Sequence, residues 1–427
     1  MKVLYVCRLF TGLEQSLKTR RWQPTGAPTI SRMIERLDKH ASDVRFILTR
    51  KDVGRGSFSG WTERNDCTLK IDGLQHEVRV LAGDERFPSW FGRWARAALR
   101  ELRHLFHITW QFWRFRPDVI YVDHANFLTA GIFARVLKVP VVYRLMGVYP
   151  AMRKALVGNR IGQRALRWSY RAPYALVVCT QDGSGVEPWL KQALRADVCT
   201  EVLLNGVDEQ SPSSAPDSTL ATIPKDRLRI LFIGKLEYYK GCEEFVDAVL
   251  RVLGLHLVQL HAIVIGTGSH REALIKKVTD AGFSTDFTFI ERLPHAKIAD
   301  AHRIVDIYVS MNWLGNLSNA NLEAMSLGDC MIFPESDPET GIDVVTDQLI
   351  GVNSARRISR ENAVEALSEV IADLIANPEE RTRLGRSMEA AAKHFIPSWE
   401  QRISHEYLLL ETLSATAMRN QKTDNFL

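Results

Sequence analysis

Short apolar runs alternate with stretches of helical periodicity along the first half of the chain. The apolar runs typical of buried strands are residues 2–7, 44–48, 119–122, 139–143 and 176–179. Between the first two runs, apolar residues recur at helical spacing at positions 30, 33, 34 and 37. A parallel sheet with helices on both faces gives this pattern, because its strands are buried on both sides. The first half therefore predicts an α/β domain of the doubly wound, Rossmann-like kind.

The same alternation resumes at about Leu228 and continues to about His394. Residues 209–226, between the two halves, are rich in proline and serine, as in an interdomain connection. Since a chain of 427 residues exceeds one ordinary core, two domains are expected. We predict domains at residues 1–208 and 228–395, a linker at 209–227, a last helix at 396–416 and a polar, disordered tail at 417–427.

Small and polar residues follow the apolar run 306–310 and open a helix at residues 318–328. Backbone N–H groups at such a helix start point outward with the positive end of the helix dipole, which suits an anion such as phosphate. Glu323 stands in the first turns of this helix, where it can accept hydrogen bonds from sugar hydroxyls. A glutamate at this place also simply improves the electrostatics of the helix, so both interpretations stay open.

Three further strand ends carry glycine, lysine or asparagine at regular intervals. Gly234 and Lys235 end one apolar run, and Lys240 and Gly241 follow, so that both lysines can reach one diphosphate. The next run ends in Gly266-Thr267-Gly268, and an earlier one ends in Asn205-Gly206-Val207-Asp208, a tight turn.

In their order and spacing these four elements resemble the retaining nucleotide-sugar glycosyltransferases of family four, which have the GT-B fold. The resemblance covers nearly the whole chain and is strongest between residues 200 and 335. It implies two Rossmann-like domains that face a central cleft, with the last helix crossing back to the N-terminal domain. It also implies a retaining transferase that uses a nucleotide diphosphate sugar, a UDP-sugar before a GDP-sugar. The acceptor would be a glycan or a lipid-linked molecule, in polysaccharide or glycolipid biosynthesis.

The resemblance assigns donor-binding roles mainly in the second half. It implies that Lys235 and Lys240 neutralise the diphosphate and that Glu323 binds the ribose. The donor-binding residues expected in the second half are Lys235, Lys240, Gly266, Gly268, Arg292, Leu293, Asn316, Ser318, Asn319 and Glu323. In the first half, Gly26, or alternatively Gly12, would approach the phosphates, although Gly26 can also serve only as a turn residue.

Asp123 and His124 end the apolar run 119–122, at the edge of the sheet where doubly wound domains bind ligands. Family members have a histidine at about this point, and the assignment to Asp123 or His124 differs by one residue. The residues expected to take part in catalysis are thus His124, Asp123, Lys240 and Glu323. One departure from the family is Gly315, which stands where many members have a second glutamate. Three explanations stay open: asparagines such as Asn316 and backbone amides contact the donor sugar, the enzyme uses an unusual donor, or donor chemistry has been lost.

Residues 89–116 hold six arginines and a single acid, Glu101, an excess equal to the net charge of +5 of the whole chain. Arginines recur at helical spacing on one face and aromatic residues on another, as in a helix that lies on an anionic membrane. The residues expected to dock are Trp90, Arg93, Trp94, Arg96, Arg100 and Arg103. The alternative is an ordinary domain helix with its arginines in water. No nucleic-acid-binding module accompanies the charge.

The composition, 46% apolar and 25% charged, is that of a globular protein without a membrane span. Six scattered cysteines without paired spacing are expected to be reduced thiols of a cytoplasmic protein, peripheral to the membrane at most. The apolar run at residues 2–7 is too short for a signal peptide. No Asp-x-Asp sequence occurs, so neither a metal nor another cofactor is expected. Two other functions stay open: a sugar-nucleotide epimerase of GT-B fold, and a catalytically silent partner subunit.

Overall fold

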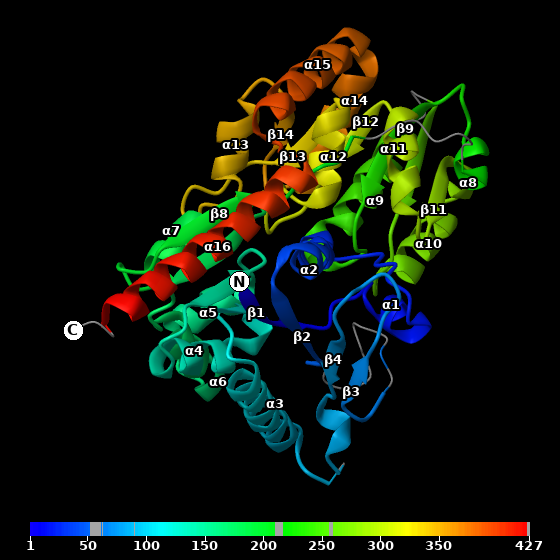
Figure 1. Ribbon diagram of the computed structural model, residues 1–427. Helices are drawn as coiled ribbons and strands as arrows, with labels where there is room; N and C mark the ends of the chain where they lie inside the picture. The colour runs from blue at the N-terminus through cyan, green and yellow to red at the C-terminus, as the bar shows by residue number, and fades with distance from the viewer. Residues whose placement is uncertain (52–60, 62, 89, 210–216, 256–258, 425–427) are drawn as a thin grey trace. The chain divides into compact units, whose positions relative to one another are not determined.

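The computed structural model describes residues 1–51, 61, 63–88, 90–209, 217–255 and 259–424. These residues form two compact units, each built on a mainly parallel sheet (Figure 1). The first unit comprises Met1–Thr180, Trp189–Leu203 and Glu400–Leu427, and the second comprises Gln181–Pro188 and Leu204–Trp399.

The strands and helices alternate along the chain as expected for doubly wound domains. The strands are β1 (Lys2–Arg8), β2 (Asp43–Thr49), β3 (Cys67–Leu69), β4 (Val78–Leu81), β5 (Val119–Asp123), β6 (Val141–Leu145), β7 (Leu176–Gln181), β8 (Thr200–Leu204), β9 (Leu228–Ile233), β10 (Leu260–Ile265), β11 (Phe287–Ile290), β12 (Ile307–Val309), β13 (Met331–Pro334) and β14 (Arg356–Ile358). The α-helices are α1 (Glu14–Thr19), α2 (Pro28–His40), α3 (Arg93–Phe115), α4 (Phe127–Val136), α5 (Pro150–Val157), α6 (Ile161–Tyr170), α7 (Val186–Ala193), α8 (Ser218–Ala221), α9 (Cys242–Gly254), α10 (Arg271–Asp280), α11 (His295–Arg303), α12 (Asn319–Leu327), α13 (Val344–Ile350), α14 (Ala363–Ala376), α15 (Pro378–Phe395) and α16 (Trp399–Asp424). Short 3₁₀ helices are η1 (Asp84–Arg86), η2 (His124–Asn126), η3 (Tyr238–Lys240) and η4 (Ser284–Asp286).

Both sheets reverse their strand order at one point. In the first sheet the order is β3-β4-β2-β1-β5-β6-β7-β8, so the order reverses between β1 and β5. In the second sheet the order is β11-β10-β9-β12-β13-β14, so it reverses between β9 and β12. The carboxyl ends of the strands at such a point diverge into helices on opposite faces, which leaves a crevice where doubly wound domains bind ligands. These two places are therefore where a site is sought.

The units differ from the predicted domains in three details. The chain changes unit after Leu203, and Gln181–Pro188 already belongs to the second unit. Much of the predicted linker at 209–227 belongs to the second core instead, since Leu220 of helix α8 and Ile223 after the helix are buried there. Residues 210–216 lie outside the described part. The predicted disordered tail is wrong over its described part, because helix α16 continues without a break to Asp424.

Helix α3 turns inward two of the arginines that were predicted to dock on a membrane. Arg100 is 7% exposed and bonds the carboxylate of Glu101 at 3.0 Å. The Nη1 atom of Arg103 lies 2.6 Å from the Asp66 carboxylate, and its Nη2 atom donates to the carbonyl of Ala82. The expectation that Arg100 and Arg103 face outward is thus wrong. Two carboxylates on neighbouring segments need a counter-charge: Arg103 supplies it to Asp66, and Arg100, whose Nη1 atom lies 3.9 Å from the carboxylate of Asp84, supplies it there.

The outward face of α3 carries large apolar side chains instead. Trp94, Leu102, Phe106 and Trp113 are exposed over 79%, 64%, 70% and 65% of their surface, and Trp90 just before the helix over 77%. Arg93 is exposed and Arg96 is half-buried. Among the described helices, none is long and apolar enough to cross a bilayer.

A buried charge cluster ties helix α16 to the first sheet. The carboxylate of Glu406 is fully buried and lies 3.2 Å from Arg144 Nε and 2.6 Å from Arg402 Nη1. It also accepts a hydrogen bond from the hydroxyl of Tyr121. Burial opposes ionisation of Glu406, but the two guanidinium groups outweigh it and hold the pKa of this carboxyl below its usual value.

We predict that Glu406→Gln lowers the stability of the first unit by about 3–5 kcal/mol, because it leaves buried guanidinium charge uncompensated. Thermal unfolding of the two proteins measures the difference. The control is Glu400→Gln, which removes a carboxylate from the same helix whose ion pair with Arg36 is exposed to solvent, so a loss within about 1 kcal/mol is expected. Equal melting temperatures for the two variants would contradict the prediction.

Candidate functional site

The edge of the second sheet where the strand order reverses carries the two predicted lysines. Gly234 and Lys235 follow β9, Lys235 is exposed, and a Cβ atom at Gly234 would meet only the ring of Phe232. Lys240 is the last residue of η3. The next residue, Gly241, is the N-cap of helix α9 and has a φ of 65°. The backbone at Gly234 is therefore open to a ligand, with a lysine at each end of the turn.

The turn after β10 packs against this turn so closely that only glycine fits. A Cβ atom at Gly266, whose φ is 151°, would overlap the carbonyl oxygen of Gly234, and one at Gly268 would overlap that of Leu236. Backbone hydrogen bonds from Leu236 to the carbonyl of Thr267 and from His270 to that of Leu236 join the two turns. Gly266 and Gly268 thus set the position of the lysine-bearing turn.

Helix α12 starts at the other side of the reversal point. Ser318 is its N-cap and accepts a hydrogen bond from the backbone N–H of Asn321. The side chain of Asn319 accepts a hydrogen bond of 2.7 Å from Asn205, so the predicted Asn-Gly turn is bound to the start of this helix. A Cβ atom at Gly206 would collide with the backbone of Trp399.

The loop between β12 and α12 is held by a buried polar network around Asn316. Its amide N–H and side-chain Nδ2 donate to the two oxygens of Asp343 at 2.7 and 2.6 Å, and its Oδ1 accepts from Ser310. Asn316 has no exposed surface. The prediction that its side chain contacts the donor is therefore wrong for this arrangement, because the polar atoms of the side chain bond inside the loop.

Gly315 has a steric reason to depart from the family pattern. Its φ is 131°, and a Cβ atom there would collide with the backbone of Asp182 and Gly183. The Gln181–Pro188 segment occupies the space that a side chain would need, and Leu317 donates to the carbonyl of Asp182 at 3.1 Å. A glutamate cannot stand at this position unless the two segments separate.

Lys240 faces an acidic partner that the sequence did not indicate. Burial lowers the pKa of Lys240 to about 8, Lys235 lowers it further, and Asp182 works in the opposite direction. Burial likewise raises the pKa of Asp182 to about 6, against hydrogen bonds from Ser184 and the charge of Lys240. The lysine that precedes α9 is thus a desolvated cation, and such a cation binds an anion more strongly than one in water.

Glu323 also has a partner that was not predicted. Its Oε1 lies 2.9 Å from Nε2 of His295, at the start of α11, and the glutamate is 7% exposed while the histidine side chain is 66% exposed. Leu293 is buried beside these residues in the core, and Arg292 is exposed. His295 thus links Glu323, expected at the ribose, to the chain segment that carries the expected donor-binding residues Arg292 and Leu293.

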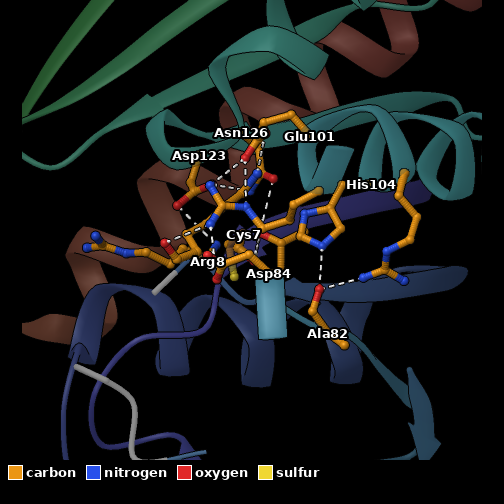
Figure 2. Close-up of polar contacts among 12 residues, drawn as sticks. Cys7, Arg8, Ala82, Asp84, Glu101, His104, Asp123 and Asn126 are labelled. Atoms are coloured by element: carbon orange, nitrogen blue, oxygen red, sulfur yellow. Dashed lines mark hydrogen bonds and ion pairs between the residues drawn. The ribbon is translucent and has the colours of Figure 1, made fainter. Parts of the chain in front are cut away.

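At the edge of the first sheet, Asp123 serves the structure rather than a ligand. It is buried, and its oxygens accept from the backbone N–H of Arg8 at 3.0 Å and from Asn126 at 2.6 Å (Figure 2). The side chain of Asn126 in turn accepts from Thr49, so the ends of β1, β2 and β5 are bound together. Burial raises the pKa of Asp123. Asp123 is thus placed to hold this edge rather than to exchange protons.

His124 lies next to Asp123 among tyrosines. Its Nε2 is 2.9 Å from the hydroxyl of Tyr170, its ring stacks on that ring with centroids 5.8 Å apart, and Tyr143 and Tyr149 flank it. Burial, followed by the charge of Arg8, lowers the pKa of His124 to about 4, so the imidazole is neutral at pH 7. Of the two adjacent candidates, His124 is the one with an accessible aromatic ring beside it, because Tyr149 is 38% exposed while Tyr143 and Tyr170 are fully buried.

Gly26 packs against Gly12 in the first unit. A Cβ atom at Gly26 would collide with the carbonyl of Thr11, and one at Gly12, whose φ is 98°, would collide with the backbone of Gly26. Both glycines in the predicted loop are therefore required by their close approach just before helix α2, whose N-terminus has no side-chain cap.

Sequence reasoning missed Asp182, His295 and Asp343. Each follows a strand or opens a helix, but its partner is distant in the sequence. Asp343 meets Asn316 across 27 residues and His295 meets Glu323 across 28, while Asp182 acts on Lys240 through charge from 58 residues away. Only the Gly183 and Gly185 pair beside Asp182, which suggests an irregular turn, could have drawn attention to that segment.

We predict that Asp343→Asn destabilises the loop at 311–318, because an amide would face two N–H donors of Asn316 and leave at least one unpaired. The expected cost is about 1–3 kcal/mol. Hydrogen exchange of the loop amides measures local opening. Asp347→Asn, one turn later on α13, removes a partly exposed pair with Arg357 and is the control. Equal protection of the loop in both variants would contradict the assignment.

The comparison with known proteins covers both units. Residues 219–390 match the family described as "Glycosyl transferases group 1", and residues 25–183 match "Glycosyl transferase 4-like domain". An uncharacterized glycosyltransferase of Methanocaldococcus jannaschii is 25% identical over 218 residues, which are 50% of this chain and 52% of that protein. The chain thus spans about half the length of this curated relative.

Solved structures share the fold over nearly the whole chain. Sucrose-phosphate synthase of Thermosynechococcus elongatus superposes with a TM-score of 0.70 at 11% identity, covering 97% of this chain and 100% of that one. The Anabaena protein Alr3699/HepE in complex with UDP superposes with a TM-score of 0.62 at 14% identity, again covering 97% and 100%. Together with the two Rossmann-like units and the family matches, this shows that the chain belongs to the group 1 glycosyltransferases of GT-B fold.

Proposed function

We propose that the protein is a retaining glycosyltransferase that takes a sugar from a nucleotide diphosphate sugar, a UDP-sugar before a GDP-sugar. The observation that carries this proposal is the pair Lys235 and Lys240 at the reversal point of the second sheet, opposite the open start of helix α12. A diphosphate leaving group gains negative charge as the bond to the sugar breaks, and cations fixed nearby stabilise that charge. The family membership and the UDP found in the Anabaena structure support the choice of donor.

In this proposal the two lysines bind the diphosphate directly, so no metal or other cofactor takes part. Lys235 is exposed at the start of the turn and Lys240 is half-buried at its end. The backbone N–H groups at Ser318 and Asn319 add donors that carry no net charge. Glu323 accepts hydrogen bonds from the ribose, for which His295 has to share or leave the carboxylate that it now holds at 2.9 Å.

The acceptor belongs to the first unit in this proposal. His124 is a neutral imidazole at pH 7 and lies beside Tyr149, which is 38% exposed, and an exposed aromatic ring packs well against a sugar ring. A glycan or a lipid-linked sugar fits such a surface. We place the enzyme in polysaccharide or glycolipid biosynthesis on the cytoplasmic side of a membrane, with the outward apolar face of α3 in peripheral contact with it.

A thermal-shift panel with UDP, GDP, ADP and their sugars tests the donor site. A ligand that binds only the folded protein raises the melting temperature. We expect a shift with UDP and UDP-sugars that is lost or strongly reduced in Lys235→Ala, with about 10- to 100-fold weaker binding for a lost charge-assisted contact. Lys276→Ala, an exposed lysine on α10 paired with Asp280, is the control and should keep the shift. If no nucleotide shifts the melting temperature, a catalytically silent partner subunit is favoured. If product analysis finds epimerised donor and no transferred sugar, the epimerase is favoured.

The pKa of Lys240 predicts how donor binding depends on pH. Because this pKa is lowered to about 8, the lysine is protonated at neutral pH and loses its charge above pH 8. Affinity for UDP should therefore decline from about pH 8, by up to about tenfold for each pH unit, and level off once the pH exceeds the higher pKa that the lysine has in the complex. In Asp182→Asn the decline should begin at lower pH, because the carboxylate that favours the charged lysine is gone. Titration calorimetry at a series of pH values measures this, and a flat profile to pH 10 would contradict it.

A further inference from the structure

A polar cavity of about 380 Å³ lies in the first unit, against the C-terminal part of α3. Strands β1 to β4 provide most of its wall. The lining residues are Lys2, Asp43, Arg45, Phe46, Ile47, Thr68, Glu77, Arg79, Trp110, Gln111, Arg114 and Phe115. Four of these are cations and two are acids, so the cavity has an excess of positive charge.

Three of the cations, Arg45, Arg79 and Arg114, make no hydrogen bond or ion pair with the described part of the chain. They lie over aromatic rings instead: Arg45 over Phe115 at 5.3 Å, and Arg79 and Arg114 over Trp110 at 5.8 and 5.0 Å. The Nε atom of Arg79 is buried without a hydrogen-bond partner. Guanidinium groups that are fixed in this way and keep their donors unused fit a phosphate, which accepts several charge-assisted hydrogen bonds at once.

The cavity does not belong to the sugar-transfer site. Lys2 and Asp43 are the first residues of the parallel strands β1 and β2, whereas Arg8 and Asp123 stand at the carboxyl ends of β1 and β5. Seven residues of strand span about 20 Å, so the two edges of the sheet are well separated. A ligand in the cavity is therefore an anchor and not a reacting group.

The outward face of α3 runs into this cavity. Trp94, Leu102, Phe106 and Trp113 are exposed along the helix, and Trp110, exposed over 42%, lies on the cavity wall. The only acid of the helix, Glu101, bonds inward to Lys51 at 2.6 Å. The exposed face thus combines large apolar side chains with arginines and holds no carboxylate. Tryptophan and arginine together are typical of segments at the interface of an anionic bilayer.

We propose that the cavity binds the phosphate of an acidic phospholipid headgroup while the outward face of α3 lies in the membrane interface. The proposal rests on the membrane contact given under the proposed function and adds its partner, an anionic lipid with an accessible phosphate. Charge complementarity favours an anionic lipid over a second copy of the chain. A second copy would bring the same unpaired arginines and would not supply the anion that they need.

Vesicle co-sedimentation with pure phosphatidylcholine and with 30% phosphatidylglycerol tests the proposal. The wild type should bind the anionic vesicles, and the triple variant Arg45→Gln, Arg79→Gln and Arg114→Gln should bind about 100-fold more weakly, since each cation at an anionic surface contributes about fivefold. A matched triple, Lys138→Gln, Arg164→Gln and Lys191→Gln, removes the same charge from exposed positions outside the cavity and should bind nearly as the wild type does. The triple variant Leu102→Ser, Phe106→Ser and Trp113→Ser should also abolish binding.

The other outcomes overturn the proposal. If the two charge triples lose binding to anionic vesicles equally, the binding is a general electrostatic attraction between the protein and the anionic surface. A thermal shift with inorganic phosphate, without vesicle binding, assigns the cavity to a soluble anion. A concentration-dependent dimer in sedimentation velocity that the serine variants dissociate, again without vesicle binding, assigns the α3 face to a second copy. The UDP-induced thermal shift is measured in every variant, because it depends on the second unit. If this shift persists while vesicle binding fails, only the lipid proposal is wrong. If the shift is missing while vesicle binding succeeds, only the donor proposal is wrong.

Discussion

The candidate donor site depends on how closely two strand-end turns of the second unit approach each other. The turn after β10 packs so closely against the turn after β9 that a Cβ atom at Gly266 or Gly268 would overlap its backbone. This contact leaves the backbone at Gly234 open and holds Lys235 and Lys240 at the two ends of one short segment. The loop after β12 is joined to this segment by a hydrogen bond from the backbone N–H of Trp313 to the carbonyl of Tyr239.

In the second unit, the loop that carries Gly315 in place of the family's glutamate is held by hydrogen bonds of its own. Gly315 leaves space for the Gln181–Pro188 segment, and Asp343 fixes the loop by bonding Asn316 twice. A loop held in this way offers backbone groups in fixed positions, and preorganised dipoles stabilise developing charge without the cost of reorienting them. The departure from the family pattern is thus a change in how the loop is held, and it leaves in place the two lysines that we propose bind the diphosphate.

In the first unit, buried ion pairs determine which face of helix α3 is exposed to solvent. Arg100 turns inward to Asp84 and Arg103 to Asp66, and this rotation of α3 places Trp94, Phe106 and Trp113 outward. A buried carboxylate without a partner costs more than an apolar side chain left in water, so the ion pairs determine the orientation of the helix. The exposed aromatic face and the arginine-lined cavity beside it are therefore consequences of the same constraint, and together they make the surface on which a lipid headgroup is proposed to bind.

The sequence by itself determined the alternation of strands and helices and the strand ends that carry Lys235, Lys240, Ser318 and Glu323, because these features depend on neighbours only a few residues away. The same local logic failed where a choice depended on distant partners. Periodicity showed that α3 has two faces, but Asp66, 37 residues before Arg103, decided which face is buried. Asn316 was a plausible ligand contact until Asp343 engaged it, and nothing near Glu323 in the chain announced His295. Only the tertiary structure could decide these points, because the energy of burying a polar group depends on whether the fold brings it a partner.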